Sequence, residues 1–421
     1  MRLNDNVGLH HSLSSGFPVL PIFIFDTDIL NQLGDSYDRR ADYIHQALTA
    51  IHTRLLQHRS TLYTYHGAPL DVFKEIVQNH TIKAVYCNRD YEPKAIERDK
   101  AVQAYLQENS IAFYDFKDQV IFDRSEILKS DRHPYTVFTP YANKWKAELT
   151  DANYAPAPVS LSNFYPSEAT AIHSLAAIGF QKTDMAFQQP ELDIAVIKNY
   201  HQYRDFPAYS HTTKLGTALR FGTISIRRCV AFALQHNETW LSELIWREFF
   251  MQILFHFPHV VSNCFKPRYE SIAWQNNEVA FKRWCDGDTG YPLVDAGMRQ
   301  LNETGFMHNR VRMVTASFLC KHLLIDWRWG EAYFAQKLVD YELSSNNGNW
   351  QWAAGCGCDA VPYFRIFNPT AQTLKFDKDL QYIKRWNPNY EQAANAPIVQ
   401  HEMAWKRALE VYRKALQETK T

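Results

Sequence analysis

Hydrophobic and polar positions follow two different patterns along the chain, and the pattern changes near residue 192. In the first 115 residues, short apolar runs alternate with longer amphipathic stretches. The apolar runs predict strands at residues 18–25, 62–65, 84–86 and 111–114, and the amphipathic stretches predict helices at 1–15, 42–57, 70–78 and 91–107. Strands and helices that alternate at this spacing indicate an α/β fold with a doubly wound parallel sheet.

Between residues 116 and 191 the regular pattern fades, and six prolines interrupt it. We expect a long linker there, without regular structure. From residue 192 to the end the pattern is helical, with amphipathic helices predicted at 238–257, 291–303, 310–324, 331–339 and 402–418. The sequence therefore predicts an α/β domain at 1–115, a linker at 116–191 and an all-α domain at 192–421.

The composition limits the classes of protein that the chain can represent. Lys and Arg together number 45 and so do Asp and Glu, so any nucleic-acid contact must come from a local patch. The seven cysteines have no paired CxxC spacing, and no signal peptide or metal-binding pattern is visible. We expect a reducing, cytoplasmic setting. No apolar run reaches the roughly 18 residues of a membrane span, so we expect no membrane partner.

The most unusual stretch runs from residue 346 to residue 369 and begins Asn-Asn-Gly-Asn-Trp-Gln-Trp-Ala-Ala. Its amides and indoles predict a turn that opens a helix, and Gly355 and Gly357 allow the backbone to come close to a ligand. Such a segment suits a large planar ligand. Taken one at a time, its residues are equally well explained as Asn caps and core Trp at a buried helix N-terminus.

Other segments of the helical half carry candidate chemistry as well. Thr212 and Thr213 precede a predicted helix, where hydroxyls and backbone amides can bind a diphosphate, although a Thr pair there is also an ordinary helix cap. Helical spacing places Glu243, Trp246 and Arg247 on one face. A surface ion pair beside a core Trp explains that second motif equally well if it is considered alone.

Together, these segments and the run Thr-Gly-Phe-Met-His-Asn-Arg-Val-Arg-Met at 304–313 closely resemble the cryptochrome/photolyase family over residues 2–415. Within the family, the chain resembles the class I cyclobutane pyrimidine dimer photolyases. The resemblance implies a carbon–carbon lyase that uses light to repair cyclobutane pyrimidine dimers in DNA. It also implies a monomer with a U-shaped, noncovalently bound FAD that is active in its reduced form.

The resemblance assigns residues to the FAD site. The matching positions are Tyr200, Thr212, Thr213, Lys214, Leu215, Gly216, Trp240, Glu243, Arg247, Arg312, Asp340, Tyr341, Glu342 and Asn346. Gly216 stands where relatives commonly have Ser, so a phosphate contact there must come from the backbone. Arg312 is expected to pair with Asp340. Asn346 is expected to face flavin N5, where an amide can present either its carbonyl or its NH2 group.

The resemblance also assigns catalytic and lesion-binding residues. Trp350, Trp327 and Trp274 match an electron-transfer chain from the flavin to the surface, although each is separately explained as a core residue. The positions that match the lesion pocket are Glu243, Trp246, Asn309, Arg310, Met313 and Trp352. Glu243 is expected to be protonated and to donate to the lesion, and Asn309 to bind a pyrimidine edge. Relatives that repair the (6-4) photoproduct have paired histidines in place of His308 and Asn309, which favours the cyclobutane dimer.

Two alternatives come from other functional classes. A cryptochrome-like photoreceptor would keep FAD and the three Trp but signal to a protein, and a flavoprotein oxidoreductase would have no use for the Trp chain. An antenna pigment, either methenyltetrahydrofolate or a deazaflavin, accompanies FAD in relatives, and Glu92 matches a folate-contacting position. The sequence leaves the identity of this pigment open.

Relatives usually begin with one more strand, whose end corresponds to Arg2 and Leu3 here. In a doubly wound sheet that strand lies in the interior, and its loss removes two ladders of hydrogen bonds. We therefore expect Met1 to be either a late start or the beginning of an N-terminal domain with a compromised antenna pocket. Adding upstream residues and comparing stability and pigment content tests this expectation.

Overall fold

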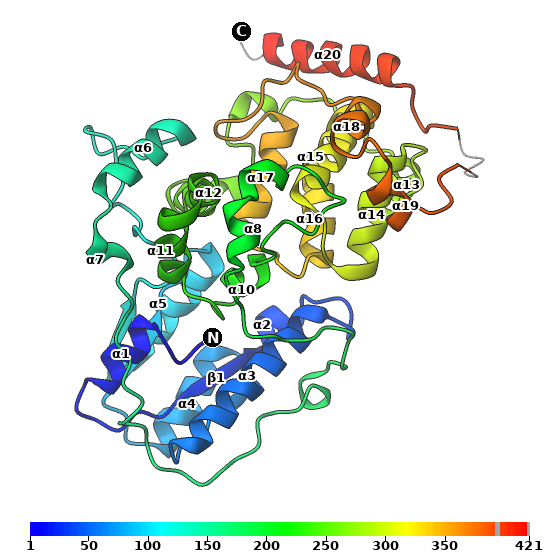
Figure 1. Ribbon diagram of the computed structural model, residues 1–421. Coiled ribbons are helices and arrows are strands. Elements are labelled where there is room, and N and C mark those ends of the chain that lie inside the picture. Colours follow the sequence, from blue (N-terminus) through cyan, green and yellow to red (C-terminus); the bar gives the residue numbers. More distant parts are fainter. Residues whose placement is uncertain (392–395, 419–421) are drawn as a thin grey trace. The chain divides into compact units, whose positions relative to one another are not determined.

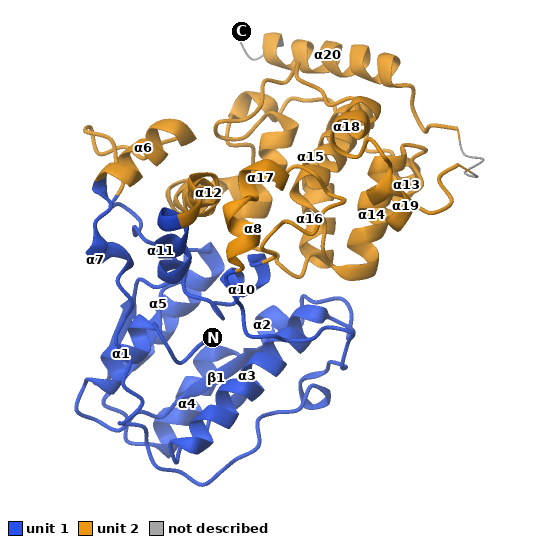
Figure 2. Ribbon diagram, in the orientation of Figure 1, with its two compact units in different colours: residues 1–126, 148–192, 215–235 blue, residues 127–147, 193–214, 236–421 orange. Residues whose placement is uncertain are grey.

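The structure is a computed structural model that describes residues 1–391 and 396–418 (Figure 1). It divides into two compact units, each built from three segments of the chain (Figure 2). Unit 1 comprises residues 1–126, 148–192 and 215–235, and unit 2 comprises 127–147, 193–214 and 236–421.

Unit 1 contains all four strands, β1 (Ile22–Asp26), β2 (Tyr63–Gly67), β3 (Ala84–Asn88) and β4 (Ala112–Phe116). β1 pairs with β2 and β3 pairs with β4, and both pairs are parallel. Among the described residues the two pairs form separate two-stranded sheets. The helices of this part are α1 (Val7–Leu13), α2 (Thr27–Leu30), α3 (Arg39–Gln57), α4 (Pro69–Asn79) and α5 (Pro93–Glu108). The predicted parallel α/β arrangement is thus confirmed.

Local chemistry explains where these helices begin. The Asp38 carboxylate accepts hydrogen bonds from the N–H groups of Arg40 and Ala41, which caps α3. α4 and α5 each begin with proline, whose fixed φ suits a first helical position and whose missing N–H is not needed there. The buried face of α3, with Leu48 and Leu55, packs in one apolar cluster with Phe25 of β1.

A segment from the second half of the sequence also belongs to unit 1. It contains α10 (Gly216–Arg220) and α11 (Ile226–His236). The guanidinium of Arg227 on α11 donates to the carboxylates of Asp5 and Asp118, both at 2.8 Å. All three side chains are nearly buried, so the pairing is shielded from solvent and joins α11 to the N-terminal segment.

The prediction that residues 116–191 lack regular structure is wrong for part of that range. α6 (Phe138–Glu148) and the short α7 (Asp151–Tyr154) lie within it. Pro140 misled the prediction because proline is compatible with the first turn of a helix. Trp145 of α6 donates its Nε1 hydrogen to Glu248 at 2.7 Å, which joins this helix to unit 2.

Unit 2 is helical, as predicted. Besides α6, its helices are α8 (Ile194–Lys198), α9 (Tyr200–Tyr203), α12 (Glu238–His256), α13 (Glu278–Asp286), α14 (Pro292–Thr304), α15 (Asn309–Ser317), α16 (Trp327–Lys337), α17 (Leu343–Ala354), α18 (Pro369–Phe376), α19 (Gln381–Trp386) and α20 (His401–Glu418). The helix predicted over 310–324 continues after Ser317 as a π-helix, η4 (Phe318–His322). The stretch from Asn346 to Asn349 lies inside α17, so the predicted turn there is wrong.

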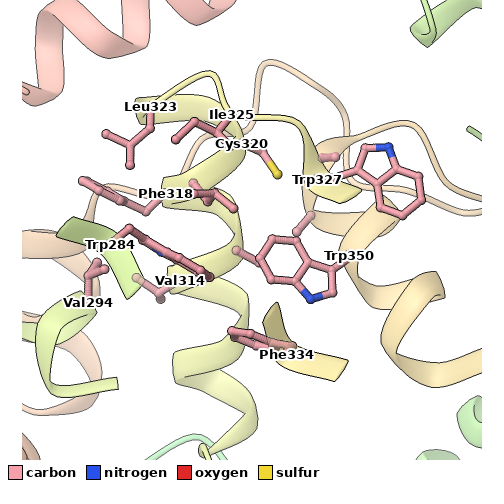
Figure 3. Packing of buried hydrophobic residues seen from close by; sticks show 14 of the residues in the cluster. Trp284, Val294, Val314, Phe318, Cys320, Leu323, Ile325, Trp327, Phe334 and Trp350 are labelled. Atoms are coloured by element: carbon pink, nitrogen blue, oxygen red, sulfur yellow. The ribbon is translucent and has the colours of Figure 1, made fainter. Parts of the chain in front are cut away.

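A large apolar cluster fills unit 2 and surrounds several Trp side chains (Figure 3). Trp284, Trp327 and Trp350 are all at most 2% exposed. In the described residues, no helix combines the length and the apolar character needed to cross a membrane.

Candidate active site

A cavity with an empty volume of about 580 Å³ lies in unit 2 among α15, α16, α17 and the turn before α17. Its lining combines apolar side chains with a few convergent polar groups, which is typical of small-molecule sites. Trp350, Phe334 and Leu338 contribute apolar surface, and Asn309 and Arg312 contribute polar groups. The sequence-predicted residues that line it are Asn309, Arg312, Met313, Asp340, Tyr341, Glu342, Asn346, Trp350 and Trp352.

Asn346 is held in one amide orientation. Its Nδ2 donates to the backbone oxygen of Glu331 at 3.1 Å and to the Glu331 Oε1 at 2.8 Å. Both amide hydrogens are thereby used, and the carbonyl oxygen is the group that remains for a ligand. Burial raises the pKa of Glu331, and the hydrogen bond from Asn346 opposes this rise. Residues from two helices therefore determine which end of the amide faces the cavity.

Two arginines near the cavity are paired with carboxylates. Arg312 donates through Nη2 to both oxygens of Asp340, at 3.1 and 2.9 Å, and through Nε to the Met307 carbonyl. Arg247 donates through Nη2 to Glu342 Oε1 at 2.7 Å. The Arg247 and Glu342 side chains are 12% and 6% exposed, so water screens this pair weakly. Each carboxylate holds its guanidinium group in place, and the two opposite charges of each pair cancel.

Glu243 on α12 is paired with a residue that the sequence analysis did not assign. Arg204 donates through Nη1 to Glu243 Oε1 at 2.5 Å, and its guanidinium carbon lies 5.4 Å from the centroid of the Tyr200 ring. Burial raises the pKa of Glu243, whereas Arg204 acts in the opposite direction. Burial also raises the pKa of Tyr200. Tyr200, Arg204 and Glu243 thus form one cluster.

Arg310 has partners within the protein. Its Nη2 donates to Asp205 Oδ1 at 2.7 Å, and its guanidinium carbon lies 4.4 Å from the centroid of the Phe376 ring. The preceding His308 caps α15, because its Nδ1 accepts the Arg310 N–H at 3.2 Å. Burial lowers the pKa of His308 to about 4, so its imidazole is neutral at pH 7.

Trp246 is stacked on an aromatic ring from α6. The Phe138 and Trp246 ring centroids are 3.7 Å apart and the ring planes differ by 6°. The Phe138 N–H donates to Asp359 Oδ2 at 3.0 Å. Asp359 follows α17, the helix that carries Trp352. Phe138 therefore contacts both segments that the sequence analysis assigned to the walls of the lesion pocket.

The three indoles assigned to electron transfer differ in burial. Trp350 and Trp327 are 2% and 1% exposed, whereas Trp274 is only partly buried. Trp350 packs edge-on against Phe334, with ring centroids 5.0 Å apart (Figure 3). Trp274 packs edge-on against Tyr412 at 6.0 Å. Trp350 and Trp327 are thus both buried, and Trp274 is the partly exposed member of the three.

The residues assigned to the diphosphate do not line the 580 Å³ cavity. Thr212 and Thr213 are partly buried, and Lys214 adopts a left-handed backbone with φ of 51°. Leu215 is buried, and Gly216 begins the five-residue helix α10. Other assigned residues outside the cavity lining are Tyr200, Trp240, Glu243, Trp246, Arg247, Trp274, Arg310 and Trp327.

Comparison with known proteins decides the family. Residues 1–160 match the family model described as DNA photolyase, and residues 240–419 match the FAD binding domain of DNA photolyase. A deoxyribodipyrimidine photo-lyase of Synechococcus sp. is 36% identical over 96% of this chain and 89% of its own length. The chain belongs to the DNA photolyase family.

Solved structures of other photolyases have the same fold. A bacterial class III photolyase from Agrobacterium tumefaciens superposes with a TM-score of 0.86 at 32% identity, over 99% of this chain and 96% of that one. An archaeal photolyase from Sulfolobus tokodaii gives a TM-score of 0.83 at 32% identity, over 98% and 97% of the two chains. That structure contains two FAD molecules, which its description connects with a novel light-harvesting cofactor.

FAD is the cofactor expected in the helical part of this photolyase-family chain, and the cavity fits its ring system. Every residue that lines the cavity lies within the matched FAD-binding segment. The apolar surface of Trp350 and Phe334 suits a planar ring, and the Asn346 carbonyl and the Arg312–Asp340 pair can bind its polar edge. When bound, FAD supplies light-driven one-electron chemistry.

Sequence reasoning missed four residues that support this photolyase site. Arg204 and Asp205 have partners, Glu243 and Arg310, that are distant in sequence. Nothing in the local pattern distinguishes Glu331 from a surface acid. Phe138 lies in the segment that was expected to be irregular. Arg204, Asp205 and Glu331 can be identified as charged residues with polar partners on other helices, a feature that needs the structure.

Proposed function

We propose that this photolyase-family enzyme uses blue light and reduced FAD to split cyclobutane pyrimidine dimers in DNA. Light-driven DNA repair is the general activity of the family, and the cyclobutane dimer is the more specific part of the proposal. The observation that carries it is the shared cavity. Asn346 and the Arg312–Asp340 pair line the same 580 Å³ space as Asn309, Met313 and Trp352. A cofactor and a flipped base can therefore be held next to each other.

The lesion must leave the base stack, because a flavin held in a protein cavity cannot reach a base inside the duplex. Trp352 and Trp246 present flat apolar surfaces that can receive the two pyrimidine rings. Asn309 offers both a donor and an acceptor to a pyrimidine edge, and Met313 is an adaptable apolar filler. This set favours the cyclobutane dimer over the (6-4) photoproduct.

The protein's own groups stabilise charge during the reaction. When bound, reduced FAD would supply the light-driven one-electron chemistry that splits the two carbon–carbon bonds of the dimer. Glu243, whose pKa is raised by burial, can hold a proton and donate it in a hydrogen bond to a lesion carbonyl. Arg204 holds the Glu243 carboxyl in place, because its Nη1 donates to Glu243 Oε1 at 2.5 Å.

The three indoles serve to keep the cofactor reduced. We assign Trp274, Trp327 and Trp350 to a path along which an electron moves inward from an external donor. Trp274 is the partly buried member and Trp350 lines the cavity. Tryptophan is readily oxidised and needs no metal, so a series of indoles suffices for this role.

A two-substrate experiment tests the proposal. Reduced holoprotein is irradiated with blue light in the presence of an oligonucleotide with one thymine cyclobutane dimer, or one with a (6-4) photoproduct. We expect light-dependent repair of the first substrate only. Repair of the second substrate alone, or of neither, would contradict the proposal. Efficient photoreduction without any repair would favour a photoreceptor instead.

A further inference from the structure

Gly330 is a buried glycine in the middle of α16, one turn after Trp327. Glycine is among the least favourable residues in a helix interior, so its presence there needs a structural reason. A Cβ atom at this position would lie 2.1 Å from Cη2 and 2.4 Å from Cζ3 of Trp350. Ordinary van der Waals contact begins at 3.4 Å. The edge of the Trp350 indole therefore rests directly on the backbone of α16.

The Trp350 ring has little freedom to move elsewhere. Phe334 packs against it at a centroid distance of 5.0 Å and an angle of 81°, and Trp284 packs against it at 6.1 Å and 72°. Both rings are at most 2% exposed (Figure 3). A side chain at position 330 would have to displace the Trp350 ring by more than an ångström, away from the helix that carries Trp327.

We propose that Gly330 is a positioning residue for electron transfer from Trp327 to Trp350 during photoreduction, which rests on the proposed function of these indoles. In this step one electron leaves the Trp327 indole and fills the vacancy on the oxidised Trp350 indole. The positive charge moves on to Trp274, and an external thiol donor reduces it. The rate of such a step falls steeply as the two rings move apart. A Cβ atom at position 330 would push the Trp350 ring away from the helix that carries Trp327, so glycine at this position keeps the transfer fast.

The experiment compares two activities of FAD-loaded Gly330→Ala. Photoreduction of oxidised FAD is followed by its visible absorbance under anaerobic blue light with dithiothreitol as the donor. Repair of a dimer-containing oligonucleotide is measured separately after reduction with dithionite. We expect the initial rate of photoreduction to fall on the order of tenfold or more, since a misplacement of about 1 Å has large effects on rates. Repair after dithionite reduction, normalised to the bound FAD, should fall far less than photoreduction.

Gly297→Ala is the matched control, because it places the same extra atom in another buried helix. A Cβ atom at Gly297 of α14 would have Val311 Cγ1 at 2.4 Å, Thr315 Cγ2 at 3.1 Å and Met307 Sδ at 3.6 Å as its three nearest atoms, none of which belongs to an indole. We expect this variant to lose stability but to keep its rate of photoreduction. Equal rates of photoreduction in wild type and Gly330→Ala would overturn the inference. A parallel loss of both activities in Gly330→Ala would overturn it as well, because general misfolding would then explain the result.

A second variant keeps the test decisive if Gly330→Ala does not fold. The added Cβ would also lie 2.6 Å from Leu319 Cδ2, and Leu319→Ala removes that clash while leaving the one with Trp350. The double variant should photoreduce slowly, whereas Leu319→Ala alone should behave as wild type. Wild-type protein that photoreduces normally but repairs nothing would contradict the proposed function and leave this inference intact. Wild-type protein that cannot photoreduce would overturn the inference.

Discussion

At the scale of single residues, the clearest case is the carboxyl of Glu243, on which two opposing effects act. Burial raises its pKa, and the Arg204 guanidinium at 2.5 Å lowers it, with burial the larger effect. The net effect is a pKa above the ordinary value of a Glu carboxyl, which favours the protonated form that can donate to developing charge. Its contribution to repair is therefore measurable apart from cofactor binding.

Glu243→Ala should leave FAD bound but lower the repair yield per absorbed photon. The loss should be about 2.7–4 kcal/mol of stabilisation if the hydrogen bond acts in a closed site. Glu243→Gln keeps a donor and should retain part of the yield. The control is Glu238→Ala on the same helix, whose side chain is 80% exposed and paired with Lys146. An unchanged yield in Glu243→Ala would remove this residue from the mechanism.

Trp274→Phe should block photoreduction by external donors and spare repair by chemically reduced protein. Repair returns the electron to the flavin, so the outer indole is needed only for photoreduction. Both activities are measured as a ratio to those of wild type. The control variant is Trp405→Phe on α20, which replaces an indole that is 39% exposed. If both activities fall together in Trp274→Phe, the residue serves packing alone.

Phe138→Ala should weaken binding of a dimer-containing oligonucleotide by about 1 kcal/mol, the typical value of an aromatic pair. The physical reason is the 3.7 Å stack on Trp246, which holds one proposed wall of the pocket. In a double-mutant cycle, Phe138→Ala should have no further effect once Trp246 is Ala. Tyr135→Ala is the control. Additive losses in the double variant would show that Phe138 does not act through Trp246.

At the scale of elements, the sequence predicted all four strands and most of the long helices, though not α11, because apolar periodicity reflects burial directly. It failed where local and tertiary signals differ. α6 was missed because Pro140 suggested a loop. The residues that hold this helix in place, Glu248 and Trp246, are about a hundred residues away, so the local pattern does not reveal them. The Asn346–Asn349 run suggested a turn, but Asn346 and Asn347 bind Glu331 and the Val260 carbonyl from within α17.

The docking of α20 should depend on pH. His322 of η4 lies 2.8 Å, Nε2 to Nδ1, from His401 at the start of α20, and Arg407 of α20 donates to the His322 carbonyl. Burial lowers the pKa of His322 to about 3, with His401, Arg407 and Lys321 as further cationic neighbours. The unfolded chain therefore binds a proton below about pH 6.5 that the folded chain excludes.

The free energy of unfolding should consequently fall as the pH drops from about 6.5 toward 3, by at most about 1.4 kcal/mol per pH unit for this residue. Urea denaturation at a series of pH values measures the slope. His322→Phe keeps the stack on Phe318, which has a centroid distance of 4.7 Å, and should reduce the slope. A slope identical to that of wild type would show that His322 titrates normally in the folded protein.

At the scale of the whole molecule, the chain has 45 basic and 45 acidic residues, so DNA binding must depend on a few local cations. Lys266 and Arg268 are candidates for backbone contacts, and Arg310, whose Nη2 donates to Asp205, is a third candidate. The logarithm of the binding constant should fall with the logarithm of salt concentration by roughly 0.9 per neutralised phosphate. Lys266→Ala should reduce this slope by about one unit. A slope near zero in wild type would favour a photoreceptor.

The sequence predicted the fold class of the whole molecule but not how the chain divides into two units. The two units exchange segments along the chain, so that 127–147 belongs to unit 2 and 215–235 to unit 1. Periodicity cannot show this, because the bonds that decide it, such as Arg227 to Asp5 and Trp145 to Glu248, join residues that are distant in sequence. The pairing of four strands into two separate sheets likewise depends on tertiary contacts.

The central claim is that reduced FAD in this protein repairs the dimer with an electron that returns. The most direct measurement is the number of thymine dimers split per protein molecule under anaerobic blue light, after the flavin has been reduced and the reductant removed. The recovery of thymine absorbance counts the products, and the flavin spectrum counts the electrons. We predict many dimers split per protein with the flavin still reduced at the end. One dimer or fewer per protein, with the flavin left oxidised, would contradict the account.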